Sequence, residues 1–254
     1  MIYTLISGIC VCLGITGGIG ISTLLRPLLD AISPLDPATL SLLCTAGTLG
    51  AALVGAFFAL SQPLPLHQDE LLLLAIGALL GGTLGDLLSA RFYAMLPARG
   101  ALFLQNALLF TLLALPAVYF SRLSGTIVPL SVTRTAALPA ALVLGVAASF
   151  LSFGAVPLTL LAYRLFFDAR EDEAAIAALS VALCAMAGKL IVQLIRLKLN
   201  IPSADVLLWL LPGTVLGALA AMIPGVQRAA HRYGASLLRL ALFSCAINMA
   251  SAFA

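Results

Sequence analysis

The sequence contains few charged residues and few of the residue types that carry catalysis or bind metals. Charged side chains make up 9% of its 254 residues, and only two residues are histidines. A soluble domain carries about 25% charged residues, so this scarcity excludes an ordinary soluble protein. Phosphate loops, zinc-ligand spacings and nucleophile elbows are absent, and the net charge of +3 forms no basic block. We therefore expect no enzyme activity, no cofactor, no bound metal and no nucleic acid as partner.

The sequence also contains few cysteines, and their spacing is not that of disulfide pairs. The five cysteines all lie in apolar stretches: Cys10, Cys12, Cys44, Cys184 and Cys245. An odd number without a spacing pattern argues against a disulfide framework, and a free cysteine behaves as a small apolar residue. The nearby pair Cys10 and Cys12 leaves open a membrane thiol–disulfide relay. A membrane assembly subunit that transports nothing is a further alternative.

Apolar residues dominate what is present. They account for 62% of the chain, and the mean hydropathy is +1.15. A membrane-spanning helix needs about 20 apolar residues, which predicts an all-α integral membrane protein of about eight segments. The lipid bilayer is its first partner, and the first segment is expected to be retained rather than cleaved as a signal peptide. The segments are expected at residues 2–29, 35–60, 70–89, 100–120, 138–166, 174–198, 205–224 and 233–253.

The two halves of the chain resemble each other. Each opens on an apolar segment with a glycine or Gly-Pro break near its middle: GICVCLGITGGIGISTLLRPLL from Gly8 to Leu29, and GVAASFLSFGAVPLTLLAYRLF from Gly145 to Phe166. The longest polar link, Ser121 to Thr135, lies between them. We therefore predict a first repeat over residues 1–121, a linker over 122–136 and a second repeat over 137–254.

The orientation of the repeats depends on the broken segments. If both cross the membrane, the repeats are parallel, and seven basic residues lie on one side against four on the other. If both are re-entrant hairpins, the repeats are inverted and the count is five against six. The charge bias favours the parallel arrangement and leaves the inverted one open.

Matching breaks in two repeats predict a transport site between them. Helix breaks in a bilayer are tolerated where the freed backbone is buried in protein or lines a cavity, and half-helix N-termini attract anions. Closer helix packing by small residues is the alternative. The predicted binding residues at the breaks are Gly17, Gly18, Gly20, Ser22, Thr23, Ser152, Gly154, Pro157 and Thr159.

Lys189 is the most informative single residue, because a charge at mid-membrane costs about 3 kcal/mol and is usually functional. Gln193 and Arg196 follow at helical spacing on the same face. We predict that Lys189 and Gln193 bind the substrate. The alternatives are that Lys189 snorkels to the interface or pairs with a carboxylate such as Asp86.

Other charged residues are expected to be structural. Arg26, beside Pro27 at the end of the first broken segment, is interpreted as an interfacial anchor. Asp86 is expected to form a boundary ion pair with Arg91. Arg239 aligns with Gln105 of the other repeat, so it either lines a shared pathway or snorkels to the interface.

Two stretches resemble the sulfite exporter TauE/SafE family. GITGGIGISTLLRPLL is similar to the glycine-rich motif that opens that family, and IGALLGGTLGDLLSARFYAMLPARGALFLQNALL, from Ile76 to Leu109, is similar to its third and fourth helices. The second repeat departs from the family in its shorter glycine cluster, SFGAVP. The resemblance implies a permease of the bacterial inner membrane that exports a small sulfur-containing anion, such as sulfite or an organosulfonate. A homodimer is left open.

Overall fold

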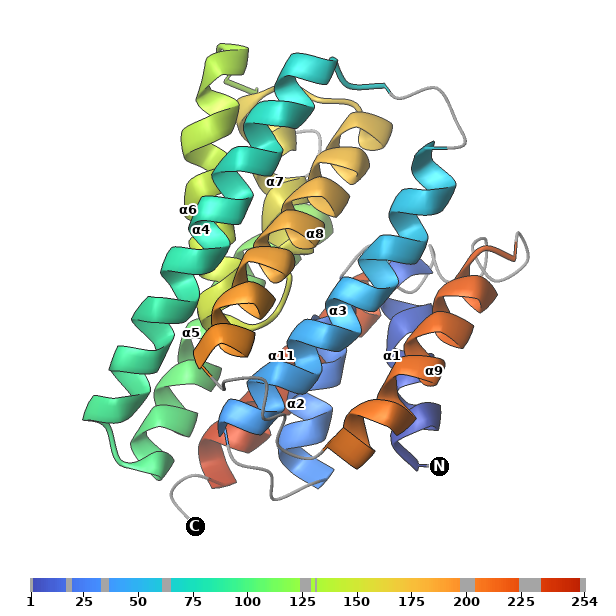
Figure 1. The fold of residues 1–254 in the computed structure, drawn as a ribbon. Helices are drawn as coiled ribbons and strands as arrows, with labels where there is room; N and C mark the ends of the chain where they lie inside the picture. Colours follow the sequence, from blue (N-terminus) through green and yellow to red (C-terminus); the bar gives the residue numbers. More distant parts are fainter. Residues whose placement is uncertain are drawn as a thin grey trace.

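In the computed structural model, the chain is a bundle of helices (Figure 1). The structure describes residues 2–16, 20–32, 37–60, 65–123, 129–130, 132–196, 204–223 and 234–251, and these ranges contain no strand. The α-helices are α1 (Ile2–Thr16), α2 (Ile21–Ile32), α3 (Pro37–Leu60), α4 (Gln68–Met95), α5 (Ala98–Val118), α6 (Ala137–Leu151), α7 (Val156–Phe166), α8 (Glu171–Arg196), α9 (Ala204–Ala221) and α11 (Gly234–Ser251). Two short helices, the π-helix η1 (Tyr119–Leu123) and the 3₁₀-helix η2 (Arg134–Ala136), flank the link between the halves.

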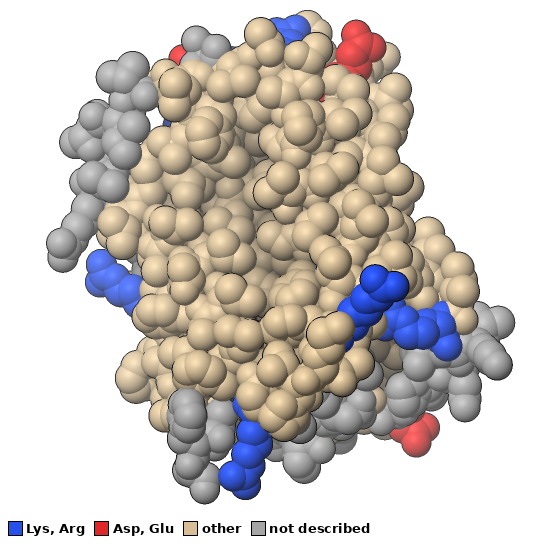
Figure 2. All heavy atoms as spheres, turned by 90° about the vertical axis from the view of Figure 1, so that its left-hand side faces the viewer, with Lys and Arg blue, Asp and Glu red and all other residues tan. Residues whose placement is uncertain are grey.

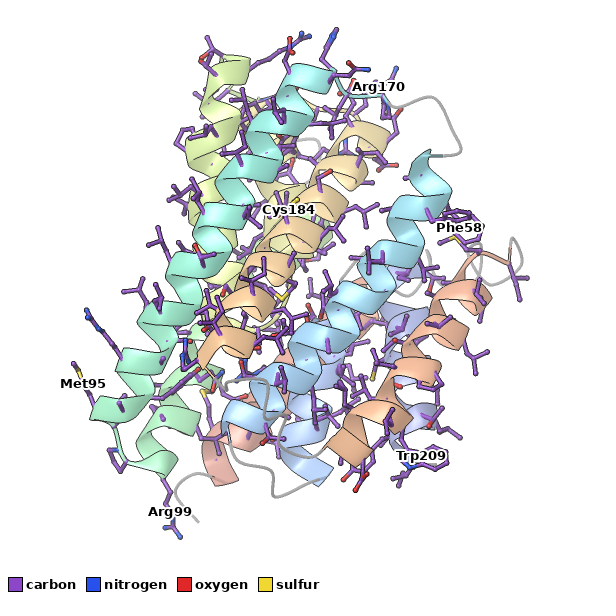
Figure 3. All side chains as sticks on the ribbon, in the orientation of Figure 1. Phe58, Met95, Arg99, Arg170, Cys184 and Trp209 are labelled. Atoms are coloured by element: carbon purple, nitrogen blue, oxygen red, sulfur yellow. The ribbon has the colours of Figure 1, made fainter. Side chains whose placement is uncertain are left out.

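The surface of the bundle is that of a membrane protein. Among the described residues, five helices are long and apolar enough to cross a bilayer, and large apolar side chains such as Phe57 and Leu72 are exposed. Figure 2 shows a broad uncharged area between charged side chains at the top of the molecule and others in its lower half. Arg170 and Arg99 lie at opposite ends (Figure 3).

The second broken segment is a hairpin. The backbone N–H groups of Leu130 and Val132, just before α6, donate to the carbonyls of Leu165 and Phe166 at the end of α7, both at 2.7 Å. The chain therefore enters α6 and leaves α7 on the same side. The preference for parallel repeats assumed that this segment crosses the membrane, and that assumption is wrong.

The first broken segment also turns back on itself. The Gly20 N–H donates to the Gly14 carbonyl at 3.1 Å, and a Cβ on Gly14 would lie 2.8 Å from the Ile21 Cα. In Figure 1 the chain enters α1 and leaves α2 at the lower end, whereas it enters α6 and leaves α7 at the upper end. The two hairpins therefore enter the bundle from opposite ends.

The helices of the two halves pack in matching pairs. Helix α4 packs on α6, as α9 packs on α1, and α5 packs on α7, as α11 packs on α2. Glycines permit the closest of these contacts. A Cβ on Gly81 of α4 would lie 2.3 Å from the Leu142 carbonyl oxygen, and one on Gly217 of α9 would lie 2.3 Å from the Gly8 carbonyl oxygen. These contacts hold each hairpin against the other half of the chain.

Candidate functional site

The tips of the two hairpins touch each other. Gly20, at the first tip, has φ +79°, and a Cβ there would lie 3.0 Å from the Val156 Cβ at the start of α7. Gly154, at the second tip, has φ +74°, and a Cβ there would lie 3.6 Å from the Ser22 hydroxyl oxygen. Both glycines are in the left-handed region that other residues avoid. The breaks predicted from the sequence therefore meet inside the protein.

The second tip has a strained backbone. Ser152 and Ala155 have φ values of +56° and +52° although neither is glycine. The left-handed region costs a non-glycine residue about 1–2 kcal/mol, so surrounding contacts must hold this conformation. Both residues are buried, and the Ser152 side chain forms two hydrogen bonds with neighbouring helices. Strain of this kind is concentrated at functional sites.

Lys189 supplies one of those hydrogen bonds. Its side chain is fully buried, and its ammonium group donates to the Ser152 hydroxyl at 2.6 Å and to the Ser149 carbonyl. Ser149 belongs to the last turn of α6, and its carbonyl also accepts a 3.3 Å hydrogen bond from the backbone N–H of Ser152. Lys189 therefore does not snorkel to the interface; it lies against the second hairpin tip.

A chain of polar side chains continues from this tip. The Ser152 and Ser41 hydroxyls are 3.0 Å apart, and the Gln193 amide donates to Ser41 at 3.1 Å. Two buried atoms near the tips have no hydrogen-bond partner among the described residues, the Gln193 Oε1 and the Ser22 hydroxyl. An unpaired buried polar group costs about 1–3 kcal/mol, and at a binding site a ligand removes that penalty.

Arg26 lies inside the protein, not at the membrane interface that the sequence predicts. It is 2% exposed, and its guanidinium donates to the Leu151 carbonyl at the end of α6. The interpretation as an interfacial anchor is therefore wrong: Arg26 extends from the first hairpin to the tip of the second. A signal was present in the sequence, because Arg26 follows Ser22 by four residues and shares its helical face.

Asp86 is the buried carboxylate beside Lys189. We call Arg26, Lys189, Asp86 and Arg196 the charged cluster. Asp86 is buried on α4. One of its oxygens accepts a hydrogen bond from Arg196, and the other lies 3.9 Å from the Lys189 ammonium. The predicted pairing with Arg91 is wrong, since Arg91 is exposed and the described ion pairs of Asp86 are with Arg196 and Lys189. The pairing of Lys189 with Asp86, left open by the sequence, is present.

The charged cluster has more positive than negative charge. Among the described buried side chains at this site, Arg26 and Lys189 are cations and Asp86 is the carboxylate, in contact with Lys189 and Arg196. The helix ends do not remove this surplus. The C-termini of α1 and α6 contribute roughly −0.5 charge each, and the N-termini of α2 and α7 roughly +0.5 each. A small anion between the tips would neutralise the excess.

The remaining predicted residues have different positions. Gly17 and Gly18 lie outside the described residues. Thr23 is buried, with its hydroxyl 3.5 Å from the Cβ position of Gly20. Pro157 occupies the first turn of α7, and the Thr159 hydroxyl donates to the Ala155 carbonyl in the same turn at 3.0 Å. Thr159 therefore braces the strained tip through the backbone.

The remaining candidates are Arg239, Gln105 and the cysteines. Arg239 is exposed and Gln105 is buried, so the described structure supports an exposed arginine at the surface rather than a shared pathway. All five cysteines are free thiols. The described residues contain no group of three His, Cys, Asp or Glu side chains that could hold a metal ion.

Comparisons of this chain with protein-family models, curated proteins and solved structures find no match.

Proposed function

We propose that the protein is a secondary transporter of a small anion and that the anion binds between the two hairpin tips. The observation that carries the proposal is the pair of fully buried cations, Arg26 and Lys189, at the point where the tips meet. Burying an uncompensated charge is strongly unfavourable. An anion that enters and leaves the site accounts for both cations.

The matching helix pairs support a duplicated architecture. The helices of one half begin at residues 2, 21, 37, 68 and 98, and those of the other begin at 137, 156, 171, 204 and 234. We propose two inverted repeats, with the linker over residues 122–136 between them. Each repeat has one re-entrant hairpin and three crossing helices, instead of four crossing segments. Transporters with inverted repeats bind their substrates at the repeat interface near the bilayer midplane.

The proposed mechanism follows from this arrangement. Arg26 and Ser22 belong to the first repeat, whereas Lys189, Ser152 and Gln193 belong to the second. Motion of one repeat against the other would open the site alternately to the two sides of the membrane. Each opening separates residues that contact the anion together when the site is closed. No cofactor takes part in this cycle.

The substrate class and location come from the family resemblance. The similarity of the first broken segment and of Ile76 to Leu109 to the TauE/SafE family leads us to propose a sulfur-containing anion, such as sulfite or an organosulfonate. It also leads us to propose a multi-pass protein of the bacterial inner membrane. Such oxyanions offer several acceptor oxygens to the donors of Arg26, Lys189 and Ser22.

Thermal unfolding of the purified protein with a panel of anions tests this function. A ligand that binds only the folded state raises its stability, by about 2.7 kcal/mol at a hundred times its dissociation constant. We expect sulfite, thiosulfate or methanesulfonate to raise the Tm more than chloride at equal ionic strength. Equal Tm values with all anions, together with no flux of any of them into proteoliposomes, would contradict the proposal.

A further inference from the structure

Asp86 lies near two cations, Arg196 and Lys189, but it forms a hydrogen bond with only one of them, Arg196. Arg196 donates a direct hydrogen bond to one oxygen of Asp86, and Lys189 lies 3.9 Å from the other oxygen. A separation of 3.9 Å is within Coulombic range but beyond hydrogen-bond reach. The two cations also differ in exposure, because the Lys189 side chain is fully buried and that of Arg196 is 43% exposed.

Among the described residues, hydrogen bonds account for two of the donors of Lys189. An ammonium group has three N–H donors, and two of them are directed to the Ser149 carbonyl and the Ser152 hydroxyl. Asp86 is too distant to accept the third. A buried ion pair offsets its desolvation only when its geometry and hydrogen bonding are good. The Lys189–Asp86 contact therefore lacks the hydrogen bond that a stabilising buried ion pair needs.

Lys189 and Arg196, the two cations that contact Asp86, lie at different heights along α8. Lys189 lies level with the hairpin tips, and Arg196, seven residues later, is the last residue of α8. Seven residues of helix span about 10 Å. Asp86 therefore bridges the buried site and the end of α8.

We propose that Asp86 is an internal counter-anion that competes with the transported anion for Lys189, and that Arg196 controls this competition by holding the carboxylate away. The inference rests on the proposed function. In the empty site, Asp86 partly neutralises Lys189. An arriving anion takes the third donor of Lys189, and Asp86 stays paired with Arg196. When the anion leaves, Asp86 again compensates the charge of Lys189, which speeds release.

Two substitutions in the same ion pair are expected to act in opposite directions. Asp86→Asn removes the competing charge, so sulfite should bind about tenfold more tightly, while maximal flux should fall because release is slower. Arg196→Gln frees Asp86 to approach Lys189, so sulfite should bind several-fold more weakly. Loss of a merely structural ion pair would lower stability in both variants and shift affinity in the same direction.

The measurement is the dissociation constant of sulfite from thermal unfolding of the full-length protein, with flux assayed in parallel. Matched controls are Asp172→Asn and Arg239→Gln, which change the same residue types at exposed positions. If sulfite binds wild type, but Asp86→Asn binds it equally or more weakly, the inference is overturned and the proposed function stands. If Asp86→Asn does not fold, unchanged or tighter binding by Arg196→Gln overturns the inference. If wild type binds no anion of the panel, the proposed function fails, and the inference fails with it.

Discussion

Replacing Lys189 with methionine is expected to reduce anion flux into proteoliposomes by roughly ten- to a hundredfold. A hydrogen bond to a charged group contributes about 1.5–3 kcal/mol, and here the lost donor is fully buried. Methionine has a similar length and no charge, so the space that the lysine side chain occupies remains filled. Asp86 keeps its hydrogen bond with Arg196, which protects the carboxylate from becoming unpaired. The measurement is initial flux of labelled sulfite at several concentrations.

The fold of this variant is checked separately from its activity. We expect monodisperse elution in detergent and a cooperative thermal transition for Lys189→Met. Arg239→Gln serves as a control, because it also removes a cation from a membrane helix but at an exposed position. Flux equal to wild type in folded Lys189→Met would remove Lys189 from the mechanism.

Replacing Arg26 with glutamine is expected to cause a loss of flux of similar size, with an added loss of stability. Arg26 compensates the partial negative charge at the end of α6 through the Leu151 carbonyl, an interaction worth up to about 2 kcal/mol when partly buried. Glutamine is shorter and carries no charge, so it loses both this hydrogen bond and the compensation of the helix end. Arg26→Lys should retain more flux, because it keeps the charge and loses only the planar donor geometry.

Comparing Arg26→Gln with Arg26→Lys separates the effect of the positive charge on flux from the effect of packing. Flux and Tm are measured on the same preparations of Arg26→Gln, Arg26→Lys and wild type. If Arg26 only tied the hairpins together, the two variants would lose flux in proportion to their loss of Tm. Greater flux in Arg26→Lys at equal Tm supports a direct role of the positive charge in anion binding.

Much of the helical architecture could be predicted from the sequence. The two breaks fall where glycine and proline interrupt apolar runs, and helices such as α3 and α8 begin close to the expected residues. The direction of the chain after each break could not be predicted. A helix break permits either a kinked crossing or a hairpin, and the hydrogen bonds of Leu130 and Val132 with the end of α7 select the hairpin. These bonds join residues that local sequence patterns do not connect.

This error in topology explains the error at Arg26. In a segment that crosses the membrane from residue 2 to 29, Arg26 would lie near the far interface. In a hairpin with its tip near Gly20, the same residue lies within two turns of the tip and is buried. Lys189 lies on α8, an uninterrupted helix, so its place along that helix could be predicted. Burial of a charge could therefore be predicted only where the helix direction was known.

The central claim is that the meeting point of the hairpin tips favours small anions, and charge-selective thiol modification at Ser22 tests it most directly. Ser22→Cys is made in a variant with all five cysteines replaced by alanine, and Ser236→Cys, exposed on α11, is the reference. The thiol is treated with ethyl methanethiosulfonates of similar size that carry either a sulfonate or a trimethylammonium group.

Relative to the reference position, we expect the sulfonate reagent to react at least about tenfold faster than the cationic one at position 22. Adding Lys189→Met should remove this preference. Equal rates for the two reagents, or faster modification by the cation, would contradict an anion site at the hairpin tips.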